Sequence, residues 1–267
     1  MPRNTGKTAR RDQRSVNARY GWIPDRPDQR DLLYSAPPLH LLKNLPTKVD
    51  LRPHCPPIYD QGQLGSCTAN AIAGAIQFDQ IIERLPQVFL PSRLFIYYNE
   101  RAIEGTVSSD SGAMIRDGMK SIAKMGVCPE RMWPYKVAKF AAKPPAACYS
   151  AAARHTAVNY LRLVQVQQQL KGCLASGYPF VFGFTVYESF ESTTVARTGR
   201  ASIPSTNERA LGGHAVCAVG YDDSQRSFLC RNSWGPRWGM KGYFTIPYGY
   251  VTDHDLAADF WTVRVVQ

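Results

Sequence analysis

The 267-residue chain is predicted to be an α+β protein of two subdomains. In its first half, small and apolar residues recur at helical spacing after Cys67, around residues 93–101 and over residues 114–125. In its second half, strand-like apolar runs cover residues 156–164, 180–187, 214–221, 227–232, 243–247 and 260–266. Helices that precede strands along the chain indicate segregated helical and β-rich parts.

The N-terminal 47 residues are expected to lie outside the main domain, which would cover residues 48–267. The formal net charge of +11 is concentrated at the start of the chain, in Arg3, Lys7, Arg10, Arg11, Arg14 and Arg19 against the single acid Asp12. Such a charge run is typical of a solvated tail. No aromatic residues are interleaved with these first charges, which weighs against a nucleic-acid partner.

Residues 20–34 differ from the basic tail because they are apolar and aromatic. Pro24 and Pro27 disfavour a helix or a central strand in this segment. The segment is too apolar to remain in water, so we expect it to pack against the rest of the molecule. Residues 36–46 would connect this segment to the domain. The domain itself would consist of a helical half at about residues 60–150 and a β-rich half at about residues 151–267.

Caps and turn residues predict where individual elements begin and end. Ser92 can cap a helix over residues 93–101, and Gly126 can end the helix over residues 114–125. A further helix is expected over residues 167–176. The proline-rich residues 129–145 and the Ser- and Thr-rich residues 191–211 are predicted to be loops, the second of them near a functional site.

The bulk composition excludes several classes of protein. No apolar run is long enough to span a membrane, and no signal peptide is recognisable, so we expect a cytoplasmic protein or export by a non-classical route. Of seven cysteines, Cys173, Cys217 and Cys230 fit core positions, whereas Cys55, Cys128 and Cys148 lie in loop-like sequence and could pair. No Cys and His residues have metal-ligand spacing, so neither a metal nor a cofactor is predicted.

A glycine-rich turn followed by Cys67 and a helix is the most informative stretch of the chain. A thiol in the first turn of a helix faces unpaired N–H groups and the positive end of the helix dipole, and both favour the thiolate. Gln61 precedes it and can direct an amide N–H toward an oxyanion formed next to the sulfur. A buried structural cysteine is the alternative, and the downstream residues argue against it.

Two later motifs supply partners for this thiol. His214 follows Gly212 and Gly213 at the start of an apolar strand, and Asn232 is followed by Trp234 and a glycine turn. An imidazole can accept the thiol proton, and an amide can fix the tautomer and orientation of the imidazole. An aromatic side chain over the His–amide pair would exclude water.

These residues resemble those of the papain-like cysteine peptidases. That family has a histidine and an asparagine about 130–150 residues after its nucleophilic cysteine, and His214 falls within this interval. The Gln-Gly…Gly-Ser-Cys run that ends at Cys67 and the Asn-Ser-Trp-Gly run that begins at Asn232 are highly specific. The likeness covers residues 49–244, and the pattern looks most like a bacterial member of the family.

The resemblance implies a papain-like fold, in which an active-site cleft separates a helical left subdomain from a β-rich right one. It implies a cysteine endopeptidase that forms an acyl-thioester on Cys67. His214 would act as acid and base, Asn232 would orient it, and Gln61 would donate to the oxyanion. Trp234 would shield Asn232.

By the same resemblance, Gly112, Ala113 and Met114 on one wall and Gly213 and Trp234 on the other are expected to bind a peptide or protein substrate. Pro-regions of the family occupy this groove, so we expect residues 20–34 to lie in it and to restrain activity, as in a zymogen. The alternative is that the segment packs on the back of the domain and has no effect on activity. No membrane partner is expected, and the protein is expected to be a monomer.

The chain departs from the family pattern in three places. Leu64 stands where a disulfide cysteine is usual, and the expected partner region, residues 109–113, also lacks a cysteine. Thr68 replaces the usual aromatic residue after the nucleophile, and Gly213 replaces a side chain often found before the histidine. None of these changes removes a catalytic group.

Three other functions are compatible with this fold. A silent peptide-binding scaffold would keep the fold without chemistry, but no catalytic position is substituted. A basic nucleic-acid binder would show strongly salt-dependent retention of oligonucleotides. An acyl-transferase would use the same residues with an amine acceptor, which product analysis would distinguish from hydrolysis.

Overall fold

The structure is a computed structural model that describes residues 20–34, 44–155 and 158–265. Its α-helices are α2 (Cys67–Ile82), α3 (Arg93–Glu104), α4 (Ile115–Met125), α5 (Ala146–Ala152), α6 (Gln167–Ala175), α7 (Thr193–Thr198) and α8 (Tyr248–Thr252). Single 3-10 turns are η1 (Arg52–His54), η2 (Val137–Lys139) and η3 (Ala153–His155). Its strands are β1 (Lys48–Asp50), β2 (Val158–Arg162), β3 (Phe180–Tyr187), β4 (Ala210–Asp222), β5 (Ser227–Arg231), β6 (Tyr243–Pro247) and β7 (Ala257–Val265).

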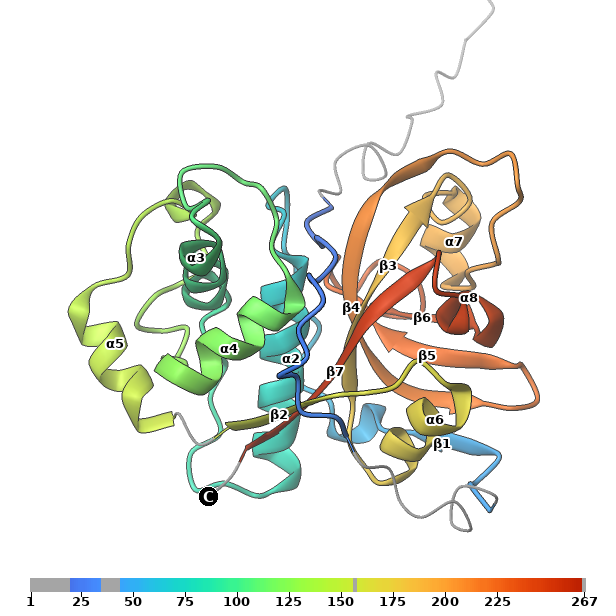
Figure 1. Cartoon of the computed structure of the whole chain (residues 1–267), viewed down its shortest axis with the longest axis horizontal. Coiled ribbons are helices and arrows are strands. Elements are labelled where there is room, and N and C mark those ends of the chain that lie inside the picture. The colour runs from blue at the N-terminus through green and yellow to red at the C-terminus, as the bar shows by residue number, and fades with distance from the viewer. Residues whose placement is uncertain (1–19, 35–43, 156–157, 266–267) are drawn as a thin grey trace, which may run out of the picture.

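The strands form one antiparallel sheet in the order β2-β7-β3-β4-β5-β6, and β1 pairs with β4 outside this path. Figure 1 shows helices α2 to α5 on one side of the molecule and the sheet on the other. The N-terminal segment, residues 20–34, passes between the two halves. The α+β architecture with two halves is therefore confirmed.

Helix α2 lies at the centre of the molecule. Nearly all of its residues are buried, because it packs against α3 and α4 on one side and against the sheet on the other. Small residues such as Ala69, Ala73 and Gly74 allow this close approach from several sides. A helix that is apolar on all faces is typical of a protein centre, so Cys67 at its first turn is held rigidly.

Strand β3 shows how the sheet divides the core. Phe180, Phe182 and Phe184 alternate with Val181, and the two sets belong to different apolar clusters on opposite faces of the sheet. One face packs on α2, and the other forms an aromatic cluster with Phe260. The sheet is thus buried on both faces.

Most predicted elements are present with small changes in their bounds. Ser92 caps α3, where its Oγ accepts a hydrogen bond from Phe95 N at 3.2 Å, and Gly126 ends α4 with φ 73°. The prediction that residues 191–211 are only a loop is wrong, because they contain α7 and the first residues of β4. Ser192 caps α7 and overrides the low helix propensity of its threonines.

The cysteines require a second correction. Cys148 lies on α5 and not in a loop, and none of the seven cysteines, all of which are described, forms a disulfide. Cys173, Cys217 and Cys230 are buried, as predicted. Within the described ranges, no helix is long and apolar enough to cross a membrane, and no group of three or more His, Cys, Asp or Glu side chains is arranged to hold a metal ion.

Candidate active site

Cys67 is the first residue of α2 and is fully buried. The turn before it is fixed from both sides: Gln61 N donates to Ser233 O at 2.9 Å, and Gly65 N donates to Asp110 Oδ1 at 3.0 Å. The second bond joins the two regions in which the expected disulfide cysteines are missing. A hydrogen bond to a carboxylate therefore connects these regions.

His214 and Asn232 meet across neighbouring strands. His214 Nε2 lies 2.8 Å from Asn232 Oδ1, which also accepts a hydrogen bond from Ser233 N at 2.8 Å. The backbone donor fixes the orientation of the amide, so its oxygen faces the imidazole. Because this oxygen can only accept, Nε2 carries the proton in a neutral ring, and Nδ1 is the basic nitrogen.

Aromatic rings exclude water from the His214–Asn232 pair. The ring centroid of Trp234 lies 4.8 Å from that of His214, and that of Phe184 lies at 5.8 Å. Burial lowers the pKa of His214 to about 4, although the hydrogen bond with Asn232 opposes the shift. The imidazole is thus held neutral in this structure.

Gln61 connects the turn before Cys67 to the loop after Asn232. Its side chain is buried, its Oε1 accepts a hydrogen bond from Ser233 Oγ at 2.6 Å, and its Nε2 donates to Leu64 O at 2.9 Å. The structure therefore brings Gln61 into the same network as Asn232, through the adjacent Ser233.

The N-terminal segment pairs with the two walls expected to bind substrate. On the helical side, Ala113 N donates to Gly21 O at 2.7 Å, and Ile23 N donates to Ala113 O at 3.0 Å. On the sheet side, Trp22 N donates to Gly213 O at 3.0 Å. Trp22 and Ala113 form an isolated parallel bridge, and the segment runs between the two halves of the molecule (Figure 1).

Gly21 and Tyr20 lie close to the predicted catalytic residues. A Cβ on Gly21 would overlap Gly65 O, two residues before Cys67, and hydrogen bonding from the Gly21 backbone acts to lower the Cys67 pKa. The Tyr20 ring lies 6.4 Å from the rings of both His214 and Trp234, and its hydroxyl donates to Glu191. The close approach requires glycine at position 21.

The electrostatic state of Cys67 differs from the sequence prediction. Burial raises the pKa of the Cys67 thiol to about 12, and nearby backbone groups of Ala215, Gly21 and Thr68 offset this only in part. The helix N-terminus was expected to favour the thiolate. In this structure desolvation outweighs it, and the thiol is neutral.

The predicted substrate-binding residues are found in three settings. Gly112, Ala113 and Gly213 contact the N-terminal segment, and Trp234 faces both His214 and Tyr20. Met114 follows Ala113 and precedes α4, and its backbone N–H donates to Glu104 Oε1 at 2.7 Å.

Two buried acids near the site were not predicted. Thr68 Oγ1 donates to Glu100 Oε1 at 2.7 Å, and burial raises the pKa of Glu100 well above its usual value. Asp259 on β7 accepts a hydrogen bond from Trp22 Nε1 at 3.1 Å. A single acid within an apolar strand, as at Asp259 between Ala258 and Phe260, was the signal that could have indicated it.

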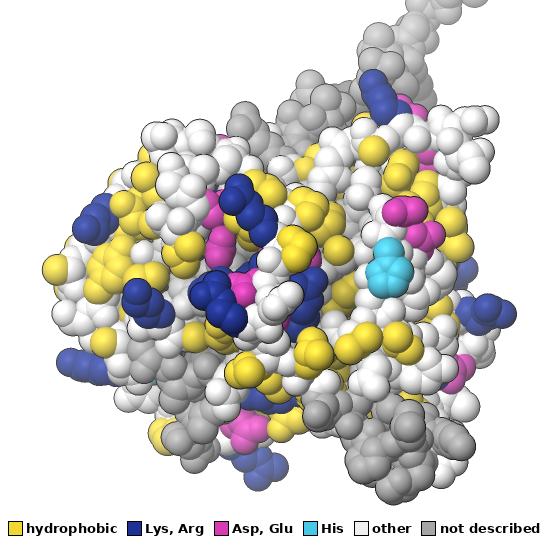
Figure 2. Space-filling view, viewed as in Figure 1, with side chains coloured by type: hydrophobic (Ala, Val, Ile, Leu, Met, Phe, Trp, Pro, Cys, Tyr) yellow, Lys and Arg dark blue, Asp and Glu magenta, His cyan; other side chains and the backbone are white. Residues whose placement is uncertain are grey.

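Ion pairs fix the second part of the N-terminal segment. Asp31 accepts hydrogen bonds from Arg116 Nε at 2.9 Å and Nη2 at 2.6 Å and from Arg162 Nη1 at 2.9 Å. Asp25 accepts from Trp261 Nε1 at 2.8 Å and from Arg116 N at 3.0 Å. Figure 2 shows acidic and basic side chains together along the middle of this face of the molecule.

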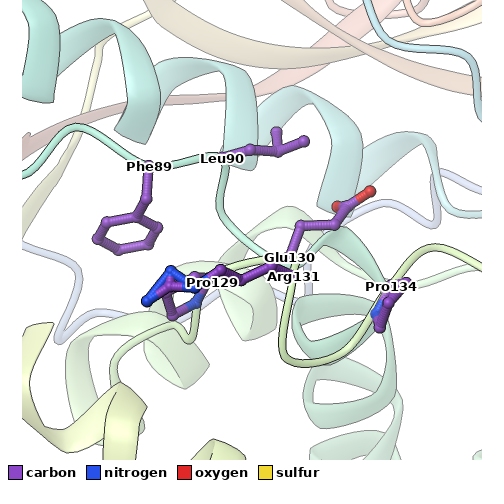
Figure 3. A pocket seen from close by; sticks show the side chains of 6 residues that line it. All are labelled: Phe89, Leu90, Pro129, Glu130, Arg131 and Pro134. Atoms are coloured by element: carbon purple, nitrogen blue, oxygen red, sulfur yellow. The ribbon is translucent and has the colours of Figure 1, made fainter.

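A separate pocket lies on the helical half. Its lining residues are Phe89, Leu90, Pro129, Glu130, Arg131 and Pro134 (Figure 3). The Glu130 carboxylate is paired with Arg93 and contributes to the packing of α3. None of the predicted catalytic residues lines this pocket.

Comparison with known proteins agrees with the geometry. The family model described as papain family cysteine protease matches residues 45–260. An uncharacterized peptidase C1-like protein of Acanthamoeba polyphaga mimivirus is 43% identical over 96% of this chain and 89% of its own length. A cathepsin B-like protein of Giardia intestinalis is 30% identical over 75% of this chain and 69% of its own length.

A solved structure with the same fold is that of xylellain, a cysteine protease from Xylella fastidiosa. It is 47% identical to this chain, has a TM-score of 0.88, and is matched over 94% of this chain and 97% of its own. The relatives thus include a viral and a bacterial protein, so the expected bacterial origin stays a prediction.

Proposed function

The chain belongs to the papain family of cysteine proteases, and from this premise we propose that it is an endopeptidase whose nucleophile is Cys67. The enzyme is a cysteine peptidase, and therefore a hydrolase. Two observations best support the assignment of residues: the His214–Asn232 bond of 2.8 Å, and the position of Cys67 as the first residue of α2.

The catalytic cycle follows from the protonation state of this pair. Because Asn232 fixes the proton on His214 Nε2, Nδ1 is the nitrogen that accepts the Cys67 proton. The Cys67 sulfur attacks the peptide carbonyl, and His214 returns the proton to the leaving amine. Water, deprotonated by the same imidazole, then hydrolyses the acyl-thioester and restores the thiol.

The oxyanion formed in each step needs donors next to the sulfur. The backbone N–H of Cys67, in the first turn of α2, is one candidate, and the Gln61 amide is the second. The bonds of Gln61 to Ser233 and Leu64 support this role, because they hold the amide rigidly before substrate arrives. All these groups come from one chain, which is consistent with activity as a monomer.

The N-terminal segment would restrain this activity in two ways. Residues 20–22 occupy the space over Cys67 and His214 and pair with both walls, so a peptide cannot enter at the same time. The burial they contribute also keeps the thiol and the imidazole neutral. Activation would then require the segment to leave or to be cut.

An irreversible epoxysuccinyl inhibitor, followed by peptide mapping, tests the nucleophile. We expect the label on Cys67 and a loss of peptide hydrolysis of several powers of ten in Cys67→Ala. Cys173→Ala is the matched control, because Cys173 is also buried but lies on α6. A label elsewhere, or turnover within about tenfold of the native enzyme in Cys67→Ala, would refute the assignment.

A further inference from the structure

The Trp22 side chain of the N-terminal segment packs against the sheet side of the proposed active site. It is only 8% exposed. A Cβ on Gly183 of β3 would overlap the indole ring, and a Cβ on Gly213 of β4 would overlap the Trp22 carbonyl oxygen and the edge of the ring, so both glycines provide space for this residue. We call this space, lined by Gly183, Gly213 and Asp259, the Trp22 site.

Asp259 is the polar group of the Trp22 site. The pairing of β7 with β3 is irregular between Val181 and Gly183, where β7 contains one extra residue, a β-bulge. Asp259 lies in this bulge with φ 60°, and its side chain faces the Trp22 site. This left-handed conformation is rare for residues other than glycine but tolerated by Asp. Asp259 is 3% exposed, and its Oδ2 accepts hydrogen bonds from Trp22 Nε1 at 3.1 Å and from Asp25 N at 2.7 Å.

We infer that the Trp22 site binds a tryptophan side chain of the substrate and that Asp259 is the residue that selects it. The inference rests on the proposed function and names its substrate class. Gly21 packs against Gly65, in the turn that leads to Cys67, and Trp22 is the next residue. A substrate would therefore place in this site the side chain one residue removed from the one whose carbonyl is attacked.

The surrounding charges favour a neutral donor over a cation. With the segment bound, Asp25 and Asp31 face Arg116 of α4 and Arg162 of β2, and Arg162 Nη2 lies 3.5 Å from Asp259 Oδ1. When the segment leaves, its two acids leave with it, and Asp259 remains beside two arginines. An arginine or lysine side chain would meet these like charges, whereas an indole N–H meets only its acceptor.

Phenylalanine should bind in this site less well than tryptophan, because it has no N–H group. Its ring would fill the same space but leave the buried Asp259 Oδ2 without the hydrogen bond that the indole donates. A hydrogen bond to a charged group is worth about tenfold or more in binding. The expected order at this position is tryptophan, then phenylalanine, then arginine.

The first test uses the full chain and needs no hydrolysis. The alkylation rate of Cys67 by iodoacetamide, located by peptide mapping, reports how firmly the segment is bound. We expect Trp22→Phe to speed labelling about tenfold, and to have less effect in the Asp259→Asn background, where Asn tolerates the same backbone conformation. Equal labelling of the native chain and Trp22→Phe would overturn the inference.

The second test uses the full chain with Trp22→Gly and Asp31→Ala, which removes the indole from the site and the main charged anchor of the segment. Acetyl-Trp-Ala-amide should protect Cys67 from iodoacetamide at about tenfold lower concentration than acetyl-Phe-Ala-amide, and acetyl-Arg-Ala-amide should protect least. The matching aminomethylcoumarin peptides should be hydrolysed with kcat/KM values in the same order. Asp259→Asn should remove most of the difference between tryptophan and phenylalanine.

The outcomes separate the two proposals. Hydrolysis of all three peptides with no preference for tryptophan would overturn the tryptophan site and leave the endopeptidase assignment standing. Selective protection by the tryptophan peptide, with no peptide hydrolysed, would overturn the endopeptidase assignment and support the site.

Discussion

At the residue scale, the protonation state of Cys67 is decided by competition between two effects of known size. A helix N-terminus favours a negative charge by about 0.3–1 kcal/mol, and by about 2 kcal/mol in good geometry. Complete burial shifts a pKa by up to about 3–5 units, which corresponds to a larger free energy. Burial therefore determines the protonation state of Cys67 while residues 20–34 are bound. Once these residues leave, the helix N-terminus can lower the pKa of the thiol.

This balance predicts the titration of Cys67 in the full chain. Because burial raises its pKa to about 12, the thiolate should be absent at neutral pH and appear only in strong alkali. The check is the ultraviolet thiolate absorbance of the native chain minus that of Cys67→Ala, followed as the pH is raised. A titration step below about pH 9 would contradict the prediction.

Gln61 is predicted to act on kcat. Its amide is held by Ser233 and Leu64, so in Gln61→Ala the oxyanion would lose one positioned donor, and kcat should fall roughly 10²-fold. Gln63→Ala is the matched control, since Gln63 is exposed in the same turn, and should leave kcat unchanged. An unchanged kcat with a raised KM in Gln61→Ala would show that Gln61 only binds substrate.

At the element scale, periodicity and caps were sufficient to predict most helices and strands. They failed at the start of β4, because Gly212 and Gly213 offer no side-chain pattern, although Gly213 pairs with Thr185 of β3. As a result His214 lies within β4, whereas the sequence predicted it as the first residue of the strand. The bulge at Asp259 could not be predicted from the sequence either, because it depends on how β7 pairs with β3.

The N-terminal segment is itself an element whose stability can be tested. Asp31 is its main charged anchor, and it pairs with the buried Arg116. Breaking a buried ion pair costs about 3–5 kcal/mol, so Asp31→Ala should speed iodoacetamide labelling of Cys67 by about 100-fold or more. The variant should keep its circular dichroism spectrum if only the segment is released.

Asp28→Ala is the control for this variant in the same segment. Asp28 pairs with the exposed Arg30 and lies 3.7 Å from Lys120, so its loss should change labelling only slightly. Unchanged labelling in folded Asp31→Ala would mean that the ion pairs do not hold the segment.

At the scale of the whole molecule, the proposed active site draws its residues from both halves. Cys67 comes from the central helix, whereas His214 and Asn232 come from the sheet. Residue types and their order predict this set, because the proposed chemistry requires them, and the structure brings His214 and Asn232 together. The buried contacts of Glu100 with Thr68 and of Asp259 with Trp22 could not be predicted, since each joins residues that are distant in the sequence and have no local pattern.

The apolar character of residues 20–34 predicted that the segment packs against the rest of the molecule, and the structure places its first residues against Gly65, Ala113 and Gly213. A chain that begins at Leu45 should therefore have a higher kcat/KM on a small peptide than the full chain. Tethering gives even a weakly bound segment a local concentration of about millimolar, and this advantage is lost in the shortened chain.

The same shortened chain should also show faster labelling of Cys67, with a thiolate that forms at lower pH, because the thiol regains solvent and the helix N-terminus. The measurement is the second-order rate constant for an epoxysuccinyl inhibitor on both chains. The synthetic peptide of residues 20–34, added to the shortened chain, should slow labelling again, and a scrambled peptide should not. Equal rate constants for two folded chains would show that the segment covers the site without restraining it.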